Sequence, residues 1–326
     1  MQRGSFLRTA GSAAVALGAA GRLAPAGAAT KSIVIAEPVH SLGYLPLYVA
    51  IRNGYLTGYD VTMITLASSG AAHTNAVLSG QAWAFIGGPE HNAYADVKGA
   101  QLRAICNVVN RGNSYWVAAK GLTPGKDLKS FMRGKRIAVG GYGGTPNSIL
   151  RYELKKLGLD PLKDVTLVEV ATPAVPAVIA QGQADIGVMD EPMITKGVEA
   201  GAWGQPFFAG PHDLGAYAYS TINVTQKTID ADTEGVRTFV GGVKKGLAFV
   251  RDHRDETMAL AAKDFPDLSP SVLKSALARA YGDEIWEWDG KITTASVKTA
   301  QSVVIAAGLL AAEVPYQEII DPQFFK

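Results

Sequence analysis

The sequence has a single cysteine, Cys106, among its 326 residues. One thiol cannot form a disulfide within the chain or a cysteine-based zinc site, so these two classes of scaffold are excluded. Lys and Arg (31) nearly balance Asp and Glu (29), which gives no general electrostatic reason to bind nucleic acid or an anionic membrane. Only 18% of the residues are charged and 48% are hydrophobic, which favours a folded core over disorder. The length suits about two domains.

The first 29 residues differ in composition from the rest and indicate a secretory signal peptide. Two arginines precede an uncharged run of small apolar residues, 10–21, and the small residues of 25–29 predict cleavage after Ala28 or Ala29. No later stretch reaches the roughly 18 uncharged apolar residues of a membrane helix. Residues 3–8 resemble a twin-arginine motif in which glycine replaces the second arginine, so the Sec and twin-arginine routes stay open. We therefore expect an exported, periplasmic protein.

The rest of the chain contains an internal repeat in which short segments recur in the same order. The matches at a spacing of 104 residues are IVI at 33–35 with IAV at 137–139, DVT at 60–62 with 164–166, and Gly54 with Gly158, and GQA at 80–82 recurs at 182–184. Each copy has the pattern strand, helix, strand, helix, strand, helix. Short β-branched runs without polar alternation, and helices that end at glycine, indicate a parallel sheet covered on both faces. The sequence therefore predicts an α/β fold with two similar lobes, each a mostly parallel sheet flanked by helices.

The two copies define the expected domain organisation. Residues 30–112 form the first part of lobe 1 and residues 121–215 form lobe 2. The strand-like segments 113–120 and 216–225 are expected to be crossing strands that join the lobes. Residues 226–326 have an amphipathic helical pattern without a motif, which predicts helices over 231–253, 254–264, 270–281 and 293–312. We expect this part to pack mainly on lobe 1. Two crossings permit a hinge closure in which each lobe stays rigid.

A series of short motifs runs through nearly the whole chain after residue 29. They are GYLPLYVA at 43–50, GYL at 54–56, SGQA at 79–82, GKRIAV at 134–139, LGL at 157–159, GQADI at 182–186 and EP at 191–192. Their order resembles the periplasmic solute-binding proteins of nitrate/sulfonate/taurine-type ABC importers, which include binders of thiamine-precursor pyrimidines. The resemblance implies a type-II periplasmic-binding fold, one small-molecule solute, and the permease and ATPase of an ABC importer as partners. We expect a monomer without a cofactor.

Six loops are expected to face the cleft, because ligands of open α/β sheets bind beyond the carboxyl ends of the strands. These loops are 36–44, 67–73, 87–92, 140–147, 171–176 and 189–193, and none of them contains Lys or Arg. They carry Glu37, Glu90, Asp190 and Glu191 instead. Carboxylates favour a ligand with N–H donors or a cation. The alternative role for Glu90 and Glu191 is to complement the dipole at a helix start.

Other side chains of these loops could also contact a ligand. Histidines could serve as neutral hydrogen-bonding groups, tyrosines as flat surfaces, and hydroxyls either as helix caps or as ligand contacts. A zinc site made by His40, His73 and His91 is not assigned, because no pair has the spacing of metal ligands. The predicted ligand-binding residues are His40, Ser41, Tyr44, Ser68, Ser69, Glu90, His91, Tyr142, Gly144, Thr145, Asp190, Glu191 and Asn223.

Three functions fit this pattern: a transport receptor, an enzyme on the same scaffold, and a sensory partner. The chain lacks Gly-x-Ser-x-Gly and His-Glu-x-x-His motifs, and Cys106 falls inside a predicted strand, 102–109, so a transport receptor is favoured over an enzyme. An acid/base pair of His91 and Asp190 keeps the enzyme open as an alternative. The expected solute is neutral or cationic and nitrogen-bearing, such as a pyrimidine or an amide. A sulfonate, nitrate or other small organic anion is the alternative, which Arg111 would favour if its side chain pointed inward.

Overall fold

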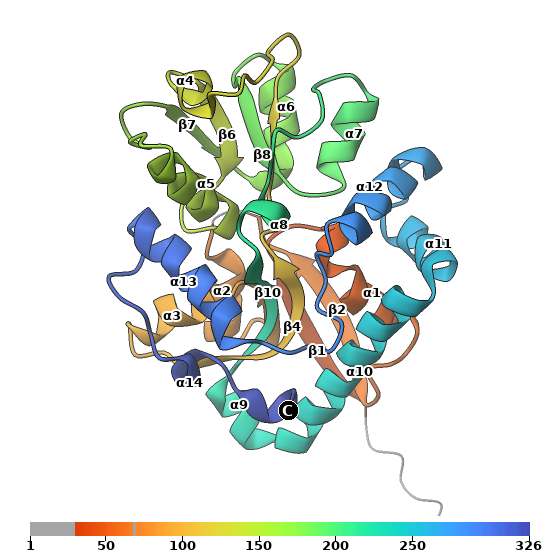
Figure 1. Ribbon diagram of the computed structural model, residues 1–326. Helices are drawn as coiled ribbons and strands as arrows, with labels where there is room; N and C mark the ends of the chain where they lie inside the picture. Colours follow the sequence, from red (N-terminus) through yellow and green to blue (C-terminus); the bar gives the residue numbers. More distant parts are fainter. Residues whose placement is uncertain (1–29, 68–69) are drawn as a thin grey trace, which may run out of the picture.

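The computed structural model describes residues 30–67 and 70–326, which form two lobes and a helical C-terminal part (Figure 1). The predicted signal peptide, 1–29, and the predicted contacts Ser68 and Ser69 lie outside the described residues. Within the described part of the chain, no helix combines the length and the apolar character needed to cross a membrane.

Lobe 1 contains a five-stranded sheet with the order β2-β1-β3-β10-β4. Its strands are β1 (Lys31–Glu37), β2 (Tyr59–Thr65), β3 (Ala84–Gly87), β4 (Leu102–Arg111) and β10 (Ala216–Thr225). Strand β1 pairs in parallel with β2 and β3, whereas β10 runs antiparallel between β3 and β4. The connecting helices are α1 (Leu45–Arg52), α2 (Ala72–Leu78) and α3 (Glu90–Asp96).

Lobe 2 repeats this arrangement with the order β7-β6-β8-β5-β9. Its strands are β5 (Tyr115–Ala118), β6 (Arg136–Gly140), β7 (Thr166–Val170), β8 (Ile186–Met189) and β9 (Phe208–Ala209). Its helices are α4 (Leu128–Met132), α5 (Thr145–Lys156), α6 (Val175–Ala180), α7 (Met193–Glu199) and α8 (Gly210–Asp213). In both lobes the first repeat strand lies between the second and the third, and an antiparallel strand follows. The predicted α/β fold of two similar, mostly parallel lobes is confirmed.

The two lobes are connected by short segments. The strand-like segment 113–120 contains β5, which pairs with β8 and β9 of lobe 2, and the segment 216–225 is β10, which pairs with β3 and β4 of lobe 1. Each is therefore the antiparallel member of a single sheet. The chain passes between the lobes in the few residues before each of these strands, near 112–114 and 210–215.

The C-terminal part is helical, as expected, but two helix boundaries differ from the pattern. The helix predicted over 231–253 is divided at Asp232, because its carboxylate accepts a hydrogen bond from the Gly235 N–H at 2.9 Å and caps a new helix. The helix predicted to reach residue 312 ends before Gly308, whose φ of +85° terminates it. The observed helices are α9 (Gln226–Ala231), α10 (Thr233–Asp252), α11 (Arg254–Asp264), α12 (Pro270–Gly282), α13 (Thr294–Ala307) and α14 (Tyr316–Ile319).

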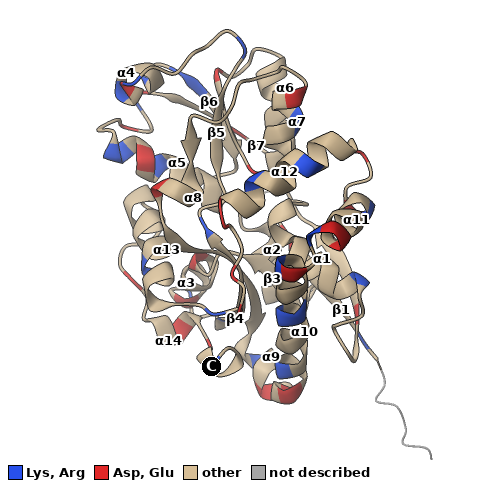
Figure 2. Cartoon of the chain, turned by 45° about the vertical axis from the view of Figure 1, so that its right-hand side comes forward, with Lys and Arg blue, Asp and Glu red and all other residues tan. Residues whose placement is uncertain are grey.

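These helices pack on both lobes. Helix α10 packs on α1 of lobe 1, and α13 packs on β10 of lobe 1 and on α5 of lobe 2. Helix α12 contacts α7 of lobe 2. Figure 2 shows positions of Lys and Arg interspersed with positions of Asp and Glu along the outer helices α10 and α11. The C-terminal part therefore extends the core of lobe 1 and also contacts lobe 2.

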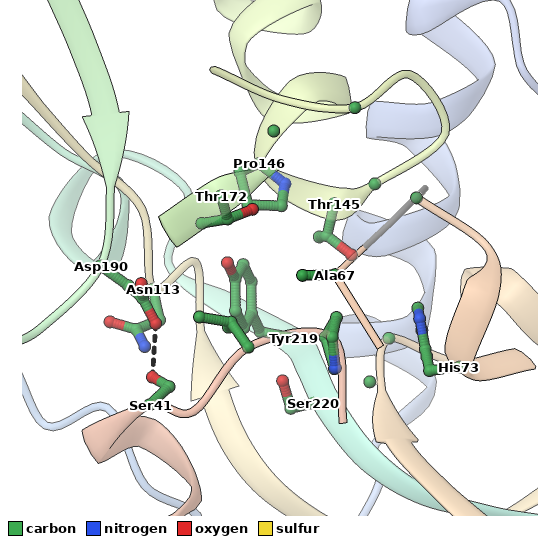
Figure 3. Close-up of a pocket in the computed structure, with 18 of the residues that line it drawn as sticks. Ser41, Ala67, His73, Asn113, Thr145, Pro146, Thr172, Asp190, Tyr219 and Ser220 are labelled. Carbon is green, nitrogen blue, oxygen red and sulfur yellow. Dashed lines mark hydrogen bonds between the residues drawn. The ribbon is translucent and has the colours of Figure 1, made fainter. Parts of the chain in front are cut away.

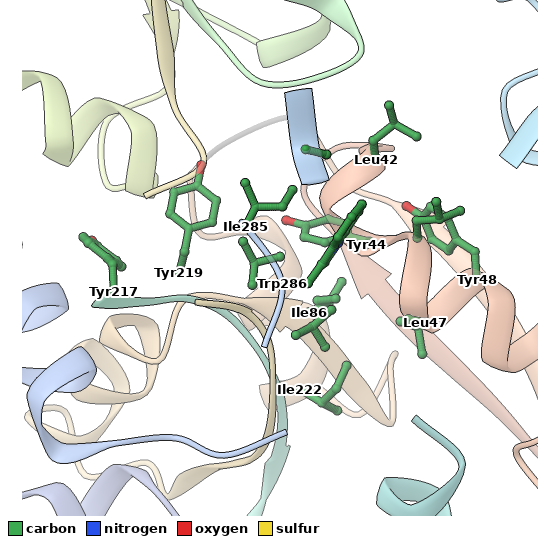
Figure 4. Packing of buried hydrophobic residues seen from close by; sticks show 14 of the residues in the cluster. Leu42, Tyr44, Leu47, Tyr48, Ile86, Tyr217, Tyr219, Ile222, Ile285 and Trp286 are labelled. Atoms are coloured by element: carbon green, nitrogen blue, oxygen red, sulfur yellow. The ribbon is translucent and has the colours of Figure 1, made fainter. Parts of the chain in front are cut away.

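The segment after α12 enters the core of lobe 1. Trp286 is 3% exposed, and its indole N–H donates to the Gly43 carbonyl oxygen at 3.0 Å. Figure 4 shows Trp286 and Ile285 beside Tyr44 in the layer of buried side chains. Residues more than 200 positions later in the sequence therefore hold the loop after β1 in place. That loop forms part of the cavity described next.

Candidate ligand-binding site

A cavity lies between the two lobes, and each of the six predicted loops contributes to its wall. Its free volume is about 70 Å³. Figure 3 shows Tyr219 in the middle of this site, between Asp190 on one side and His73 on the other. No Lys or Arg is found among the described residues of the wall. The six predicted loops therefore meet around one cavity.

Six of the predicted ligand contacts line this cavity. They are Ser41, Tyr44, His91, Gly144, Thr145 and Asp190. A seventh, Glu90, lies directly behind the wall, where its carboxylate accepts a hydrogen bond from the Thr145 hydroxyl and lies against the backbone of Gly88.

The other four predicted ligand contacts that the structure describes do not line the cavity. Two of them, His40 and Tyr142, are exposed. His40 is exposed, bonds to Glu37 at 3.1 Å and stacks on Tyr48 with a centroid distance of 4.7 Å. Tyr142 is 52% exposed and lies 5.0 Å below the guanidinium group of Arg151.

Glu191 and Asn223 are buried but bonded away from the cavity. Glu191 accepts hydrogen bonds from the Thr195 hydroxyl at 2.7 Å and from Arg279 Nε at 2.7 Å. Asn223 accepts from Asn92 Nδ2 at 2.8 Å and donates to the Gly87 carbonyl at 3.0 Å. Their polar groups are therefore used within the protein.

Hydrogen bonds across the cleft hold the two lobes together. The Ser41 hydroxyl of lobe 1 donates to the Asp190 carboxylate of lobe 2, and the Leu42 N–H donates to the Glu191 carbonyl at 3.2 Å. At the other end, Thr145 of lobe 2 donates to Glu90 of lobe 1. Ser41 also caps the short helix that begins at Leu42, because its oxygen accepts from the Gly43 N–H at 3.1 Å. The structure is therefore a closed form, in which a capping hydroxyl also reaches the other lobe.

The titratable groups at the site are shifted by burial. Burial raises the pKa of Asp190 to about 7 and the pKa of Glu90 to about 7, because removal from water disfavours the ionised carboxylate. Burial lowers the pKa of His91 to about 4 and holds the pKa of His73 well below its usual value. Near pH 7 both imidazoles are therefore neutral and both carboxyl groups are close to half-ionised.

Several buried polar atoms at the cavity have no partner within the described chain. They are both ring nitrogens of His73, Nδ1 of His91, Oγ of Ser220 and Oδ1 of Asn113, and each residue lines the wall. A buried polar group without a hydrogen bond costs about 1–3 kcal/mol. The wall therefore offers donors and acceptors that a polar ligand would satisfy.

Sequence reasoning missed part of this wall. Tyr219 and Ser220 lie on β10, which joins the lobe 1 sheet beside β3, so their approach to the site depends on a pairing between strands more than 100 residues apart. Asn113 lies where the chain first leaves lobe 1. Arg111, which could have favoured an anion, is absent from the wall and lies 3.7 Å from Glu284. Among residues 30–67 and 70–326, no group of three or more His, Cys, Asp or Glu is arranged to hold a metal ion.

Comparison with solved structures identifies the fold. The chain superposes on a protein of Bordetella bronchiseptica RB50 with a TM-score of 0.79 at 21% identity, over 90% of this chain and 95% of that one. It superposes on the alkanesulfonate-binding protein SsuA of Xanthomonas axonopodis pv. citri, bound to MOPS, with a TM-score of 0.73 at 19% identity, over 90% and 99%. A desulfurization enzyme shares the fold at a TM-score of 0.63 and 17% identity, over 90% and 97%. The protein therefore has the periplasmic binding protein fold.

The sequence comparison identifies the family. The family described as NMT1/THI5 like matches residues 42–257, so the chain belongs to this family. The chain is also 23% identical over 301 residues to a Bacillus subtilis (strain 168) protein named "Putative binding protein YtlA", covering 89% of this chain and 88% of that one.

Proposed function

We propose that this protein is the solute-binding component of an ABC-type importer, exported to the periplasm and acting as a monomer that delivers one small polar solute to a permease with its ATPase. The observation that carries the proposal is the enclosed cavity between two lobes, whose wall contains buried polar groups without partners. A ligand that bridges both lobes stabilises the closed form, because its contacts with both walls exist only after closure. The binding proteins with the same fold support this role.

The solute we propose is small and nitrogen-bearing, such as an aminopyrimidine or an amide. The cavity wall has a carboxylate at Asp190 and neutral imidazoles at His73 and His91, with no described Lys or Arg. N–H groups of a ligand can donate to the carboxylate and to an imidazole nitrogen. The aromatic ring of Tyr219, which lines the wall, can pack against a planar ligand.

A small anion is the second candidate. Helix α5 is 12 residues long and begins at the cavity, where its N-cap Gly144 supplies no side-chain cap. Free N–H groups at a helix N-terminus favour an anion. The sulfonate-binding protein with the same fold makes sulfonates the first anions to test.

A thermal-shift screen separates these candidates. The purified mature protein is mixed in turn with aminopyrimidines, amides, sulfonates, nitrate and carboxylates, because a ligand that binds only the native state raises the melting temperature. We expect a nitrogen-bearing hit, which calorimetry then confirms with one solute per chain. A sulfonate or nitrate hit with inert nitrogen compounds would reverse the choice of solute. Chemical conversion of the hit on incubation would replace the receptor with an enzyme.

A further inference from the structure

The buried carboxyl groups of this protein fall into two sets. Five carboxyl side chains are buried in the described chain: Glu37, Glu90, Glu153, Asp190 and Glu191. Three of them have a basic partner. Glu37 bonds to His40 at 3.1 Å, Glu153 lies 2.9 Å from Lys156 Nζ, and Glu191 lies 2.7 Å from Arg279 Nε.

Glu90 and Asp190 are the exceptions. Neither forms an ion pair with a Lys, Arg or His nitrogen within 4.0 Å in the described chain, and the side chain that donates a hydrogen bond to each is a neutral hydroxyl of the opposite lobe. Asp190 lines the cavity, and Glu90 lies one layer behind it. An ionised carboxylate buried without a counter-charge is strongly disfavoured. The two carboxyl groups that lack a basic partner are therefore those at the ligand cavity.

The same wall holds uncharged acceptors in reach of the cavity. His73 and His91 are each 2% exposed and have unpartnered ring nitrogens. Two histidines whose rings lie 4.7 Å apart beside a cavity could accept hydrogen bonds from a ligand without adding positive charge. Figure 3 shows the aromatic ring of Tyr219 between His73 and Asp190, and an aromatic face attracts a cation.

We propose that the solute brings one positive charge into the cavity, that this charge lies against the Asp190 carboxylate, and that Glu90 adds negative potential from the opposite wall. The inference rests on the proposed function, since it concerns the solute of the same site. The class it defines is a small organic cation with N–H donors, such as a protonated amine, an amidinium or a guanidinium. The ligand thus supplies the counter-charge that the chain supplies to its other buried carboxylates.

Matched probes that differ in charge but hardly in shape test this assignment. Acetamidine and guanidine are cations at pH 8, whereas acetamide and urea are their neutral counterparts, and methanesulfonate is the anionic probe. Titration calorimetry at millimolar concentrations should show at least tenfold tighter binding of each cation than of its neutral counterpart. Asp190→Asn should remove this preference, because the amide keeps the size of the side chain and the acceptor for Ser41. Asp60→Asn, at an exposed position on β2, is the matched control and should keep it.

The outcomes separate the charge assignment from the receptor function. A neutral or anionic hit in the screen, with acetamidine and guanidine inert, overturns the charge assignment and leaves the receptor function standing. Equal affinity of the cation and its neutral counterpart also overturns it. If no probe and no screened solute binds, the charge assignment is tested by the melting temperatures of the ligand-free wild type and variants. An uncompensated charge then predicts that Asp190→Asn melts about 2–4 °C above the wild type at pH 8, whereas Asp60→Asn does not. An unchanged or lower melting temperature of Asp190→Asn would contradict the charge assignment.

Discussion

Gly70 of lobe 1 lies directly against Gly144 of lobe 2. A Cβ atom at Gly70 would lie 2.3 Å from the backbone nitrogen of Gly144 and 2.6 Å from the carbonyl oxygen of Tyr142. These are backbone atoms, which cannot turn aside as the end of a flexible side chain can. The closed arrangement of the lobes therefore requires a residue without a side chain at position 70.

Gly70→Ala should oppose closure without unfolding either lobe. Opening the cleft relieves the clash, so we expect an intact fold, a larger radius of gyration in solution scattering, and solute affinity at least tenfold weaker. Gly125→Ala is the control, because a Cβ atom there meets nothing within 4 Å. Wild-type affinity in Gly70→Ala would mean that the two loops separate in the ligand-bound form.

The buried carboxyl groups should lower the stability of the closed protein as the pH rises through 7 toward 8. The pKa values of Glu90 and Asp190 are raised to about 7, so the folded state binds more protons than the unfolded state between about pH 4 and 7. Their stabilising effect is present at low pH and is lost as the pH rises through 7. From pH 6.5 to 8 the two groups together should remove roughly 1–2 kcal/mol.

The histidines act in the opposite direction at lower pH. The pKa of His91 is lowered to about 4 and that of His73 is also lowered, so stability is lost as the pH falls from 6.5 toward 4. Urea denaturation at several pH values should therefore show a decline above pH 6.5 and little change just below it. Glu90→Gln should lose about half of the decline, and an exposed change, Glu313→Gln, should leave it intact. A wild-type profile in Glu90→Gln would show that the group stays ionised in the native state.

The ion pair between α12 and lobe 2 should contribute to stability. Arg279 Nε lies 2.7 Å from Glu191, whose side chain is 1% exposed. Arg279→Met would leave a buried carboxylate with only the Thr195 hydroxyl and N–H as donors, so we expect a loss of about 2–4 kcal/mol in the free energy of unfolding. The double change Arg279→Met with Glu191→Gln should recover most of it. Arg251→Met, at an exposed helix position, should have no measurable effect on the free energy of unfolding. An equal loss in Arg251→Met would contradict the stabilising role of the Arg279–Glu191 ion pair.

The architecture can be predicted from the sequence because each lobe repeats the same order of strands and helices, and because each element has its own local sequence pattern. Matching segments such as 33–35 and 137–139 form the equivalent central strands β1 and β6, and their side chains are buried by a pattern visible in each strand. The loops at the carboxyl ends of those strands then have to meet at the cleft. Ser41, Thr145 and Asp190 could be selected on this basis alone.

The remaining features depend on packing between distant segments. His40 occupies the same loop as Ser41, yet its ring packs at a tilt against Phe265, a residue 225 positions later, with a centroid distance of 4.6 Å. Tyr219 and Ser220 reach the cavity only because β10 pairs with β3. No periodicity or motif in the sequence predicts either contact, because each depends on how the C-terminal helices and strand β10 pack in the folded protein.

The hydroxyl of Thr145 offers a test of closure that removes one hydrogen bond and little volume. It donates to Glu90 across the cleft, and the other oxygen of that carboxylate has no partner in the described chain. Thr145→Val leaves both Glu90 oxygens buried without a donor when the lobes close, which costs about 1–3 kcal/mol. We therefore expect a 5–100-fold loss of solute affinity by calorimetry, with full or nearly full recovery in Thr145→Ser. Thr166→Val, at an exposed position on β7, is the matched control. If Thr145→Val binds the solute as tightly as the wild type, the Thr145–Glu90 bond does not contribute to the ligand-bound form, and closure depends on the Ser41–Asp190 end alone.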